Sequence, residues 1–295
     1  MSKTWVEVAV NGPWGRALQP GIPVTVTEIV EAALAAHGEG AAIVHLHAYD
    51  PATGRQDDSG ETYARIIEAV RSRADVLVYP TIPLAGSALT GGAADAVARF
   101  AHIEFLAARG LIEMAVVDPG SVNFTRIDRA GAAAGFIYMN PEDHVLRGLE
   151  VAAARGVTPS YAIYEPGFAR LGAALAARFP GMPVPLYRIM FSDAFGWGFP
   201  PRGYGLDAHL ALLAEVAREA PWMIAGLGVD LTGLIAEAVS RGGHVRVGLE
   251  DAPFGEPRSN AELVAEAVRI VRQAGGEPAT AADVRAGLVA AGRIG

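Results

Sequence analysis

The chain has 295 residues, of which 51% are hydrophobic and 19% are charged, and its formal net charge at pH 7 is −8. This length and apolar content favour one large buried core. The negative charge, without any block of lysine and arginine, argues against nucleic acid and anionic membranes as partners. The lack of cysteine excludes disulfides, thiolate metal sites and cysteine nucleophiles.

The N-terminal residues show no signal for export. No basic region followed by an apolar stretch occurs between Met1 and Val10, and no run in the chain reaches the about 18 apolar residues that a membrane-spanning helix needs. We therefore expect a cytoplasmic protein.

Strand-like and helix-like segments alternate along the whole chain. In chain order, the predicted strands are Trp5–Val10, Ala41–His47, Val76–Tyr79, Met114–Val117, Pro159–Tyr164, Leu186–Phe191, Trp222–Gly226 and His244–Gly248. The helices predicted after them run from Thr25 to Gly38, over Tyr63–Ser72 and Ala94–Arg109, from Asn140 with Pro141 as the first helical residue, over Phe168–Phe179, Leu206–Glu219 and Leu231–Arg241, and from Ser259. Thr25 and Ser259 each precede a glutamate at the spacing of a capping box.

This alternation predicts an α/β fold. Eight βα units in succession are typical of a parallel sheet closed into a (β/α)8 TIM barrel, as a single domain over residues 1–295. An open doubly wound sheet is the alternative, but no G-x-G-x-x-G follows the first strand. Ala281–Ala290 is predicted as an extra helix packed outside the barrel. The loops Asp118–Met139 and Ser192–Gly205 are long, and long loops are often functional.

His45 and His47 end the second predicted strand. Residues i and i+2 of a strand point to the same face, so the two imidazoles project together at the rim of the barrel. Glu250 follows strand eight, and strands two and eight both flank strand one in a closed barrel. The three side chains form a candidate site for a divalent metal with an open coordination position. Alternatively, one histidine is buried and hydrogen-bonded, the other is exposed, and Glu250 belongs to a solvated loop.

Arg246 precedes Glu250 by four residues on the same strand. The even spacing directs it to the barrel interior, where a buried guanidinium requires a carboxylate, and Asp251 is the nearest candidate. Such a pair would hold Asp251 ionised as a general base. Alternatively, Arg246 only braces the barrel. Asp118 and Ser121, in the loop after strand four, are further candidates for binding substrate or for shaping the turn.

Several motifs together resemble the β-keto acid cleavage enzymes. They are Gly40-Ala-Ala-Ile-Val-His-Leu-His47, Asp50-Pro-Ala-Thr-Gly-Arg55, Gly120-Ser-Val-Asn-Phe124, Tyr164-Glu165, Gly242-Gly-His-Val-Arg-Val-Gly-Leu-Glu-Asp251 and Ser259-Asn-Ala-Glu-Leu263. The resemblance spans nearly the whole chain. It implies a TIM barrel, one zinc ion per chain, a homotetramer, and the condensation of a β-keto acid with acetyl-CoA to acetoacetate and a new CoA thioester.

The resemblance also implies roles for single residues. His45, His47 and Glu250 match the zinc ligands, Asp251 matches the general base, and Arg246 matches the residue that holds it. Zinc stabilises the enolate that forms when the base removes a C2 proton.

This sequence departs from the family member that cleaves 3-keto-5-aminohexanoate. Trp14 replaces the glutamate that resembles a clamp for the substrate amine, and Ser160 and Ala162 replace two further acids. Thr81 stands at the position of an active-site serine, and Val116 at that of a threonine. We therefore predict a less polar substrate without the amine, with Trp14 against its tail.

A second departure lies after strand six, where Phe191-Ser-Asp-Ala-Phe-Gly-Trp-Gly198 replaces a glycine-rich tract of the family. If that tract shapes the thioester site, another enolate reaction is an alternative to acyl transfer. A metal-dependent hydrolase or lyase on the same barrel and a non-catalytic relative that binds metal or a small ligand are further alternatives. Two histidines and a glutamate also accept Fe, Co, Ni or Mn.

Overall fold

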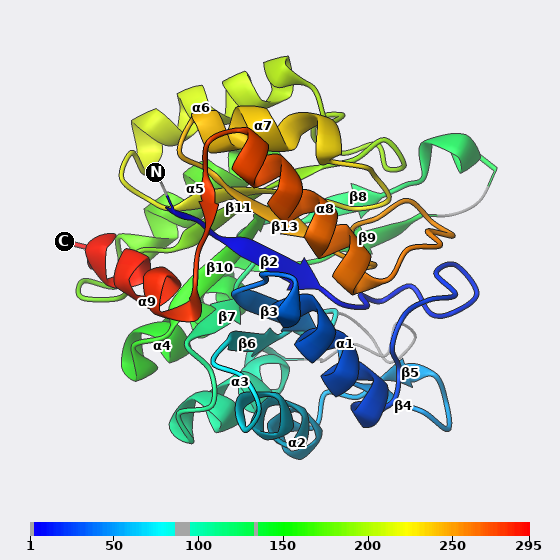
Figure 1. The fold of residues 1–295 in the computed structure, drawn as a ribbon. Helices are drawn as coiled ribbons and strands as arrows, with labels where there is room; N and C mark the ends of the chain where they lie inside the picture. Colours follow the sequence, from blue (N-terminus) through cyan, green and yellow to red (C-terminus); the bar gives the residue numbers. More distant parts are fainter. Residues whose placement is uncertain (1–2, 86–94, 133–134) are drawn as a thin grey trace.

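The computed structural model describes residues 3–85, 95–132 and 135–295, and these form a barrel of parallel strands inside a ring of helices (Figure 1). The barrel strands are β2 (Val6–Ala9), β3 (Ile43–Leu46), β6 (Leu77–Pro80), β7 (Met114–Val116), β10 (Thr158–Ile163), β11 (Leu186–Phe191), β12 (Trp222–Gly226) and β13 (His244–Val247). The helices that follow them are α1 (Val26–Gly38), α2 (Gly60–Arg71), α3 (Ala96–Ala108), α4 (Glu142–Arg155), α5 (Pro166–Ala176), α6 (Gly203–Val216), α7 (Thr232–Ser240) and α8 (Asn260–Gln273).

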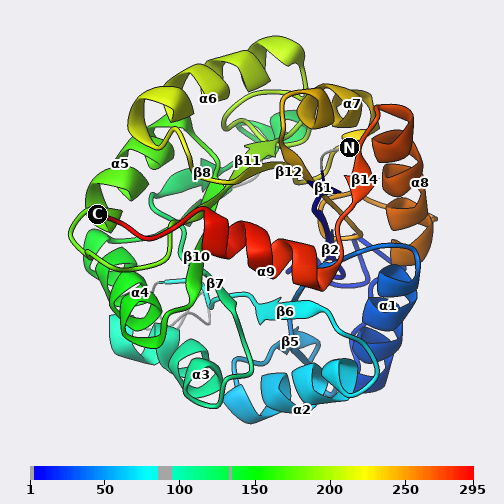
Figure 2. The ribbon, with the colours of Figure 1, turned by 60° about the vertical axis from the view of Figure 1, so that its left-hand side comes forward.

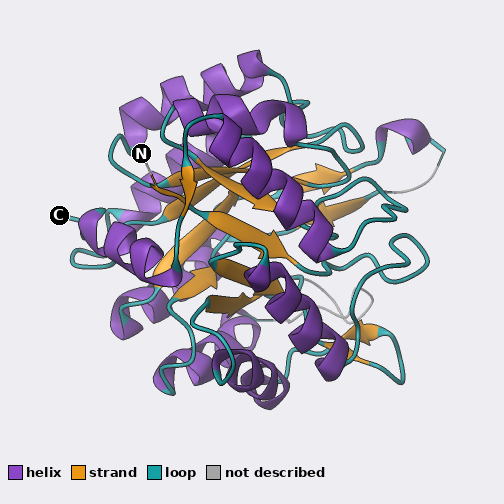
Figure 3. Ribbon diagram, in the orientation of Figure 1, coloured by secondary structure: helices purple, strands orange, loops and turns teal. Residues whose placement is uncertain are grey.

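The barrel sheet has the order β6-β3-β2-β13-β12-β11-β10-β7, and the strand pairings along this order are parallel. Its two edge strands, β6 and β7, contact each other, so the barrel is nearly closed. As predicted, β2 lies between the strand that carries the two histidines and the strand that precedes Glu250. The helices cover the outside of the strands (Figure 3). The predicted α/β TIM barrel is therefore confirmed.

Helix ends follow the local capping chemistry. Both predicted capping boxes are present, with Thr25 at the start of α1 and Ser259 at the start of α8. The helix predicted from Asn140 begins later, because Pro141 has extended backbone at the N-cap position and is not the first helical residue. The helix predicted from Ala94 begins at Ala96 after the cap Asp95, and Ala94 itself lies outside the described residues.

Three other helices begin earlier than predicted. They are α2, α5 and α6, which begin at Gly60, Pro166 and Gly203. Their first turns contain glycine, proline and polar residues, which the apolar periodicity used for the prediction does not detect.

The C-terminal helix α9 (Ala281–Ala290) crosses the end of the barrel at which the strands begin (Figure 2). Its Val284 is fully buried, and its Arg285 pairs at 2.8 Å with Glu113 and Asp75, which precede β7 and β6. Beside it, β1 (Lys3–Thr4) pairs with β14 (Glu277–Pro278). The predicted extra helix is confirmed, but it closes one mouth of the barrel instead of packing outside it. Only the mouth at the carboxyl ends of the strands then remains for a site.

Two antiparallel hairpins extend from that mouth. The first consists of β4 (Tyr49–Asp50) and β5 (Arg55–Gln56). The second, β8 (Val122–Phe124) and β9 (Phe136–Tyr138), lies within the long loop after β7 and is joined by the short helix η1 (Ile127–Arg129). Among the described residues, no helix has the length and apolar character needed to cross a membrane.

Candidate metal centre and substrate cavity

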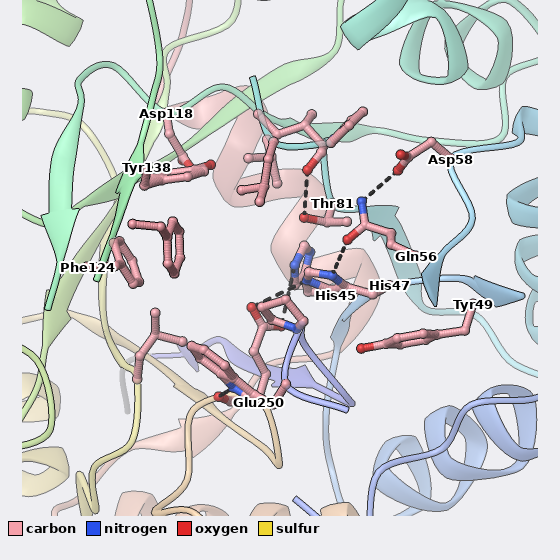
Figure 4. Close-up of a pocket in the computed structure, with 18 of the residues that line it drawn as sticks. His45, His47, Tyr49, Gln56, Asp58, Thr81, Asp118, Phe124, Tyr138 and Glu250 are labelled. Atoms are coloured by element: carbon pink, nitrogen blue, oxygen red, sulfur yellow. Dashed lines mark hydrogen bonds and ion pairs between the residues drawn. The ribbon is translucent and has the colours of Figure 1, made fainter. Parts of the chain in front are cut away.

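A cavity of about 610 Å³ opens at the carboxyl ends of the barrel strands (Figure 4). His45 and His47, at the end of β3, line it together with Glu250, which follows β13. Gln56 comes from the β4–β5 hairpin and Asp118 from the segment after β7. TIM-barrel enzymes place their active sites at this end of the strands.

His45 and His47 flank the carboxylate of Glu250. His45 Nε2 lies 3.5 Å from Glu250 Oε2, and His47 Nε2 lies 3.5 Å from Glu250 Oε1. One ligand atom from each of the three buried residues lies within 4.8 Å of the others. Within the described part of the chain, His47 Nε2 and Glu250 Oε2 have no hydrogen-bond partner. Buried polar atoms without partners are costly, so this donor set fits a divalent metal that these three residues could hold.

The hydrogen bonds behind His47 decide which of its ring nitrogens is free. Gln56 Nε2 donates to Asp58 Oδ1 at 2.6 Å, so Gln56 Oε1 faces His47 Nδ1 at 3.0 Å. Because an amide oxygen only accepts, His47 Nδ1 carries the proton. His47 Nε2 then keeps its lone pair toward Glu250, which is the arrangement of a metal-binding histidine with its outer partner.

Burial and charge place the ligands in the protonation states that bind metals. Burial lowers the pKa of His45 well below its usual value, although the negative charge of Glu250 opposes this shift. Burial raises the pKa of Glu250, but Arg246 and the two imidazoles outweigh it and hold that pKa well below its usual range. At neutral pH the centre therefore contains a neutral imidazole and an ionised carboxylate.

Arg246 lies behind Glu250 and connects buried carboxylates. Its Nη2 lies 2.8 Å from Asp251 Oδ1 and 3.0 Å from Glu250 Oε1, and its Nε donates to both oxygens of Asp251. The predicted pairing of Arg246 with Asp251 is thus present. A third carboxylate, Glu7 of β2, lies 3.4 Å from Nη1 and was not expected. Burial raises the pKa of Asp251 to about 6 against the effect of Arg246.

Asp251 itself is not among the residues that line the cavity. It is 2% exposed, and its Oδ2 also accepts the backbone N–H of Gly226 at 3.3 Å. The next residue, Leu227, does line the cavity, so Asp251 lies directly behind the cavity wall.

The end of β2 sets the position of two of the ligands. The buried amide of Asn11 accepts the backbone N–H of His47 at 2.9 Å and donates to its carbonyl at 2.8 Å. Gly12 has a φ of +69°, and a Cβ at this position would lie 2.4 Å from Glu250 Cγ. A glycine is required here because both the backbone conformation and the close approach of Glu250 exclude a side chain.

Trp14, Thr81 and Asp118, which were predicted to contact the substrate, line the cavity. Trp14 Nε1 donates to the backbone carbonyl of Glu250 at 2.7 Å, and its ring stacks on Phe195 at a centroid distance of 5.8 Å. The indole is therefore held in place beside the ligands.

Ser121 lies elsewhere. It is exposed, it is not among the lining residues, and its Oγ accepts the backbone N–H of Asn140 at 2.8 Å. Its hydroxyl supports the chain before α4, so we no longer assign it to the substrate.

The chain matches one protein family over almost its whole length. Residues 3–289 match the family described as beta-keto acid cleavage enzyme. The chain belongs to this family. The resemblance inferred from the sequence motifs is thereby confirmed.

Relatives of this β-keto acid cleavage enzyme are named for different substrates. The 3-keto-5-aminohexanoate cleavage enzyme of Fusobacterium nucleatum subsp. nucleatum is 31% identical over 274 residues, which cover 90% of each chain. The 3-dehydrocarnitine:acetyl-CoA trimethylamine transferase of Rhizobium meliloti is 28% identical and covers 90% of this chain and 88% of the relative. The 3-oxoadipate:acetyl-CoA acetyltransferase of Cupriavidus necator is 28% identical and covers 95% and 93%.

Solved structures share the barrel. The apo structure of ObcA superposes with a TM-score of 0.67 at 18% identity, covering 90% of this chain and 65% of ObcA. A type I 3-dehydroquinate dehydratase from Clostridium difficile superposes with a TM-score of 0.53 at 12% identity. These likenesses support the fold.

An aromatic wall forms part of the cavity of this family member. Phe124 and Tyr138 come from the β8–β9 hairpin and Tyr164 follows β10, and the ring centroids of Phe124 lie 5.7 Å and 5.2 Å from those of the two tyrosines. Figure 4 shows Phe124 and Tyr138 on the side of the cavity opposite Tyr49. This wall extends the apolar surface that Trp14 was predicted to provide.

Sequence reasoning missed three residues of the site. Arg188 was detectable, because it is a charge within the otherwise uncharged strand Leu186–Phe191 and its side chain lines the cavity. The roles of Gln56 and Asn11 had no such signal, because each depends on a contact with His47 made by a distant segment.

Proposed function

We propose that this protein condenses a β-keto acid with acetyl-CoA, with zinc held by His45, His47 and Glu250. The products are acetoacetate and the CoA thioester of the acyl group that the keto acid loses. The observation that carries the proposal is the convergence of the three metal-ligand side chains on one cavity in a member of this family. The names of the relatives from Rhizobium meliloti and Cupriavidus necator support acetyl-CoA as the co-substrate.

The donor set leaves coordination positions for the substrate. A bound divalent metal would polarise the keto group and stabilise negative charge on its oxygen. Two imidazoles and one carboxylate suit zinc, although Fe, Co, Ni and Mn also bind such ligands. We expect about one zinc per chain in the purified protein.

In this proposal Asp251, which matches the general base of the family, takes a proton from the carbon between the keto and carboxylate groups. Because Asp251 lies behind the cavity wall, this transfer requires the wall at Leu227 to open toward Asp251 when the substrate binds. Arg246 is a positioning residue, since it holds both the carboxylate of Asp251 and that of Glu250.

The carbanion then attacks the acetyl carbonyl of acetyl-CoA and expels CoA as the thiolate. This thiolate attacks the original keto carbon, and cleavage of the carbon–carbon bond gives the new acyl-CoA thioester and the carbanion of acetoacetate, which takes the proton back from Asp251. Trp14 and Thr81 line the space that the substrate occupies beside the metal centre.

Two substitutions test these assignments. Asp251→Asn should keep the metal and lower turnover by a factor of about 10²–10⁴, whereas His45→Ala should lose both. Asp75→Asn, an exposed member of an ion pair at the closed end of the barrel, is the matched control and should behave as wild type. Metal analysis and acetoacetate formation from a panel of β-keto acids are the measurements. An unchanged rate in Asp251→Asn would remove the base, and zinc without acetoacetate would remove the transfer reaction.

The homotetramer and the cytoplasmic location remain predictions from the resemblance and the sequence. Light scattering of the purified protein tests the tetramer directly.

A further inference from the structure

Arg188, in the wall of the cavity, is a buried cation with hydrogen-bond donors that have no partner among the described residues. It belongs to β11, is 3% exposed, and lines the same cavity as the metal centre. A guanidinium has five N–H donors. Nη2 donates to Asp118 Oδ1 at 3.4 Å and to the Ser160 carbonyl at 3.2 Å, which leaves Nε and Nη1 without hydrogen bonds among the described residues. Arg246, by contrast, contacts three carboxylates.

Asp118 does not satisfy Arg188. Its Oδ1 accepts the backbone N–H of Ala162 and its Oδ2 accepts the hydroxyl of Tyr138, both at 2.7 Å. Each oxygen therefore has a closer donor than Arg188, whose 3.4 Å contact to Oδ1 is long and engages only Nη2. A buried guanidinium with free donors is costly unless an acceptor occupies them, so an acceptor on the substrate is the expected partner.

Arg188 faces the metal centre from the opposite side of the barrel. In the strand order β6-β3-β2-β13-β12-β11-β10-β7, β11 is four strands away from β3, which carries His45 and His47. In a barrel of eight strands this separation is half of the circumference. A substrate whose reacting end lies at the two histidines therefore extends its other end toward Arg188.

The positive charge of Arg188, at the end of the cavity away from the two histidines, disfavours a cationic substrate group. Ser160 and Ala162 of β10 lie beside β11 in the sheet and bring no negative charge. A substrate ammonium would meet the guanidinium without a free carboxylate in compensation. A carboxylate, in contrast, matches the planar fork of an arginine.

We infer that Arg188 binds a second carboxylate at the far end of the substrate, so that this enzyme acts on 3-oxo dicarboxylic acids. The inference rests on the proposed function for the reaction at the near end. It revises the expectation of a less polar substrate: the methylene groups lie against the aromatic wall, and the end of the chain is anionic.

Three six-carbon 3-oxo acids test the inference. They end in a carboxylate, a methyl group or an ammonium group, and their binding to the zinc-loaded protein is measured by titration calorimetry. We expect the wild type to bind the dicarboxylate at least about tenfold more tightly than the methyl analogue, and the ammonium analogue least tightly, because a hydrogen bond to a charged group contributes this much. Equal affinity for the dicarboxylate and the methyl analogue would overturn the inference, and this comparison needs no variant.

Arg188→Gln then locates the effect. Affinity for the dicarboxylate should fall by about 10- to 100-fold and affinity for the methyl analogue by less than about threefold. Arg269→Gln, which removes an exposed charge from α8, is the control and should change neither. An equal loss for all three acids would place Arg188 at the carboxylate next to the keto group and would also overturn the inference. If none of the acids yields acetoacetate, the proposed reaction fails, while the binding data still decide the role of Arg188.

Discussion

Replacing Gln56 by methionine tests the hydrogen-bond chain behind His47. The substitution removes the acceptor that lies 3.0 Å from His47 Nδ1 and keeps a side chain of similar length. Gln56 is partly buried on the short β4–β5 hairpin, so the barrel itself should be unaffected. Without this acceptor, the imidazole is no longer held in the tautomer that presents the Nε2 lone pair.

The expected effect follows from one lost hydrogen bond. A neutral hydrogen bond contributes about 0.5–1.5 kcal/mol net, and outer partners of metal-bound histidines change metal affinity by about 10–100-fold. Water can replace part of the interaction at a half-buried position. We therefore expect the lower end of that range, about tenfold weaker zinc binding or about 1.4 kcal/mol.

The assay is competition of the metal-free protein against a chromophoric zinc chelator at pH 7, with urea unfolding as a separate measure of stability. Gln273→Met, which removes an exposed amide bonded to Arg269 on α8, is the control and should bind zinc as wild type does. If Gln56→Met bound zinc within about twofold of wild type, the assignment of the His47 tautomer would be refuted.

Two further substitutions address the packing of the ligands and the stability of the fold. Gly12→Ala should weaken zinc binding at least about tenfold, because its Cβ would lie 2.4 Å from Glu250 Cγ. Gly15→Ala is the control, since Gly15 has a similar φ of +68° but open space around it. It should lower the free energy of unfolding in urea by only roughly 1–2 kcal/mol, the cost of a left-handed alanine, and leave zinc affinity unchanged. Equal zinc affinities for the two variants would contradict this reading. Burial lowers the pKa of His209 from 6.5 to about 4. As the pH is lowered from 6.5 to 4, the unfolded chain therefore binds a proton at this residue before the folded chain does, and the free energy of unfolding decreases. This residue should lower the free energy of unfolding of the wild type by on the order of 2 kcal/mol between pH 7 and pH 5, measured by urea unfolding. If the free energy of unfolding of His209→Leu decreased as much as that of the wild type over this range, the assignment would be refuted.

Local patterns were sufficient to predict much of the fold and to bring the three candidate metal ligands together. The alternation of strand and helix predicted the barrel, and the spacing of His45 and His47 placed both imidazoles on one face of β3, as the structure has them. Arg246 also follows from spacing, because an even number of residues separates it from Glu250. These features depend only on the strand repeat and on which strands are neighbours.

Longer-range contacts were not accessible in this way. The partner of His47 on the β4–β5 hairpin, Gln56, and the exclusion of Ser121 from the cavity depend on how loops fold back over the barrel mouth. The path of α9 likewise depends on the shape of the opposite mouth, which its own sequence does not describe.

The sequence by itself thus predicted the barrel and the candidate metal-ligand triad, because the strand repeat and the order of neighbouring strands specify them, and its motifs indicated the family. Only the tertiary structure decided what surrounds the triad. Closure of the barrel brings β11 opposite β3 and directs Arg188 into the same cavity as His45, although 143 positions of sequence separate the two residues (188 − 45). No local sequence pattern predicts that these two residues meet, because their contact with one cavity depends on the circumference of the closed sheet.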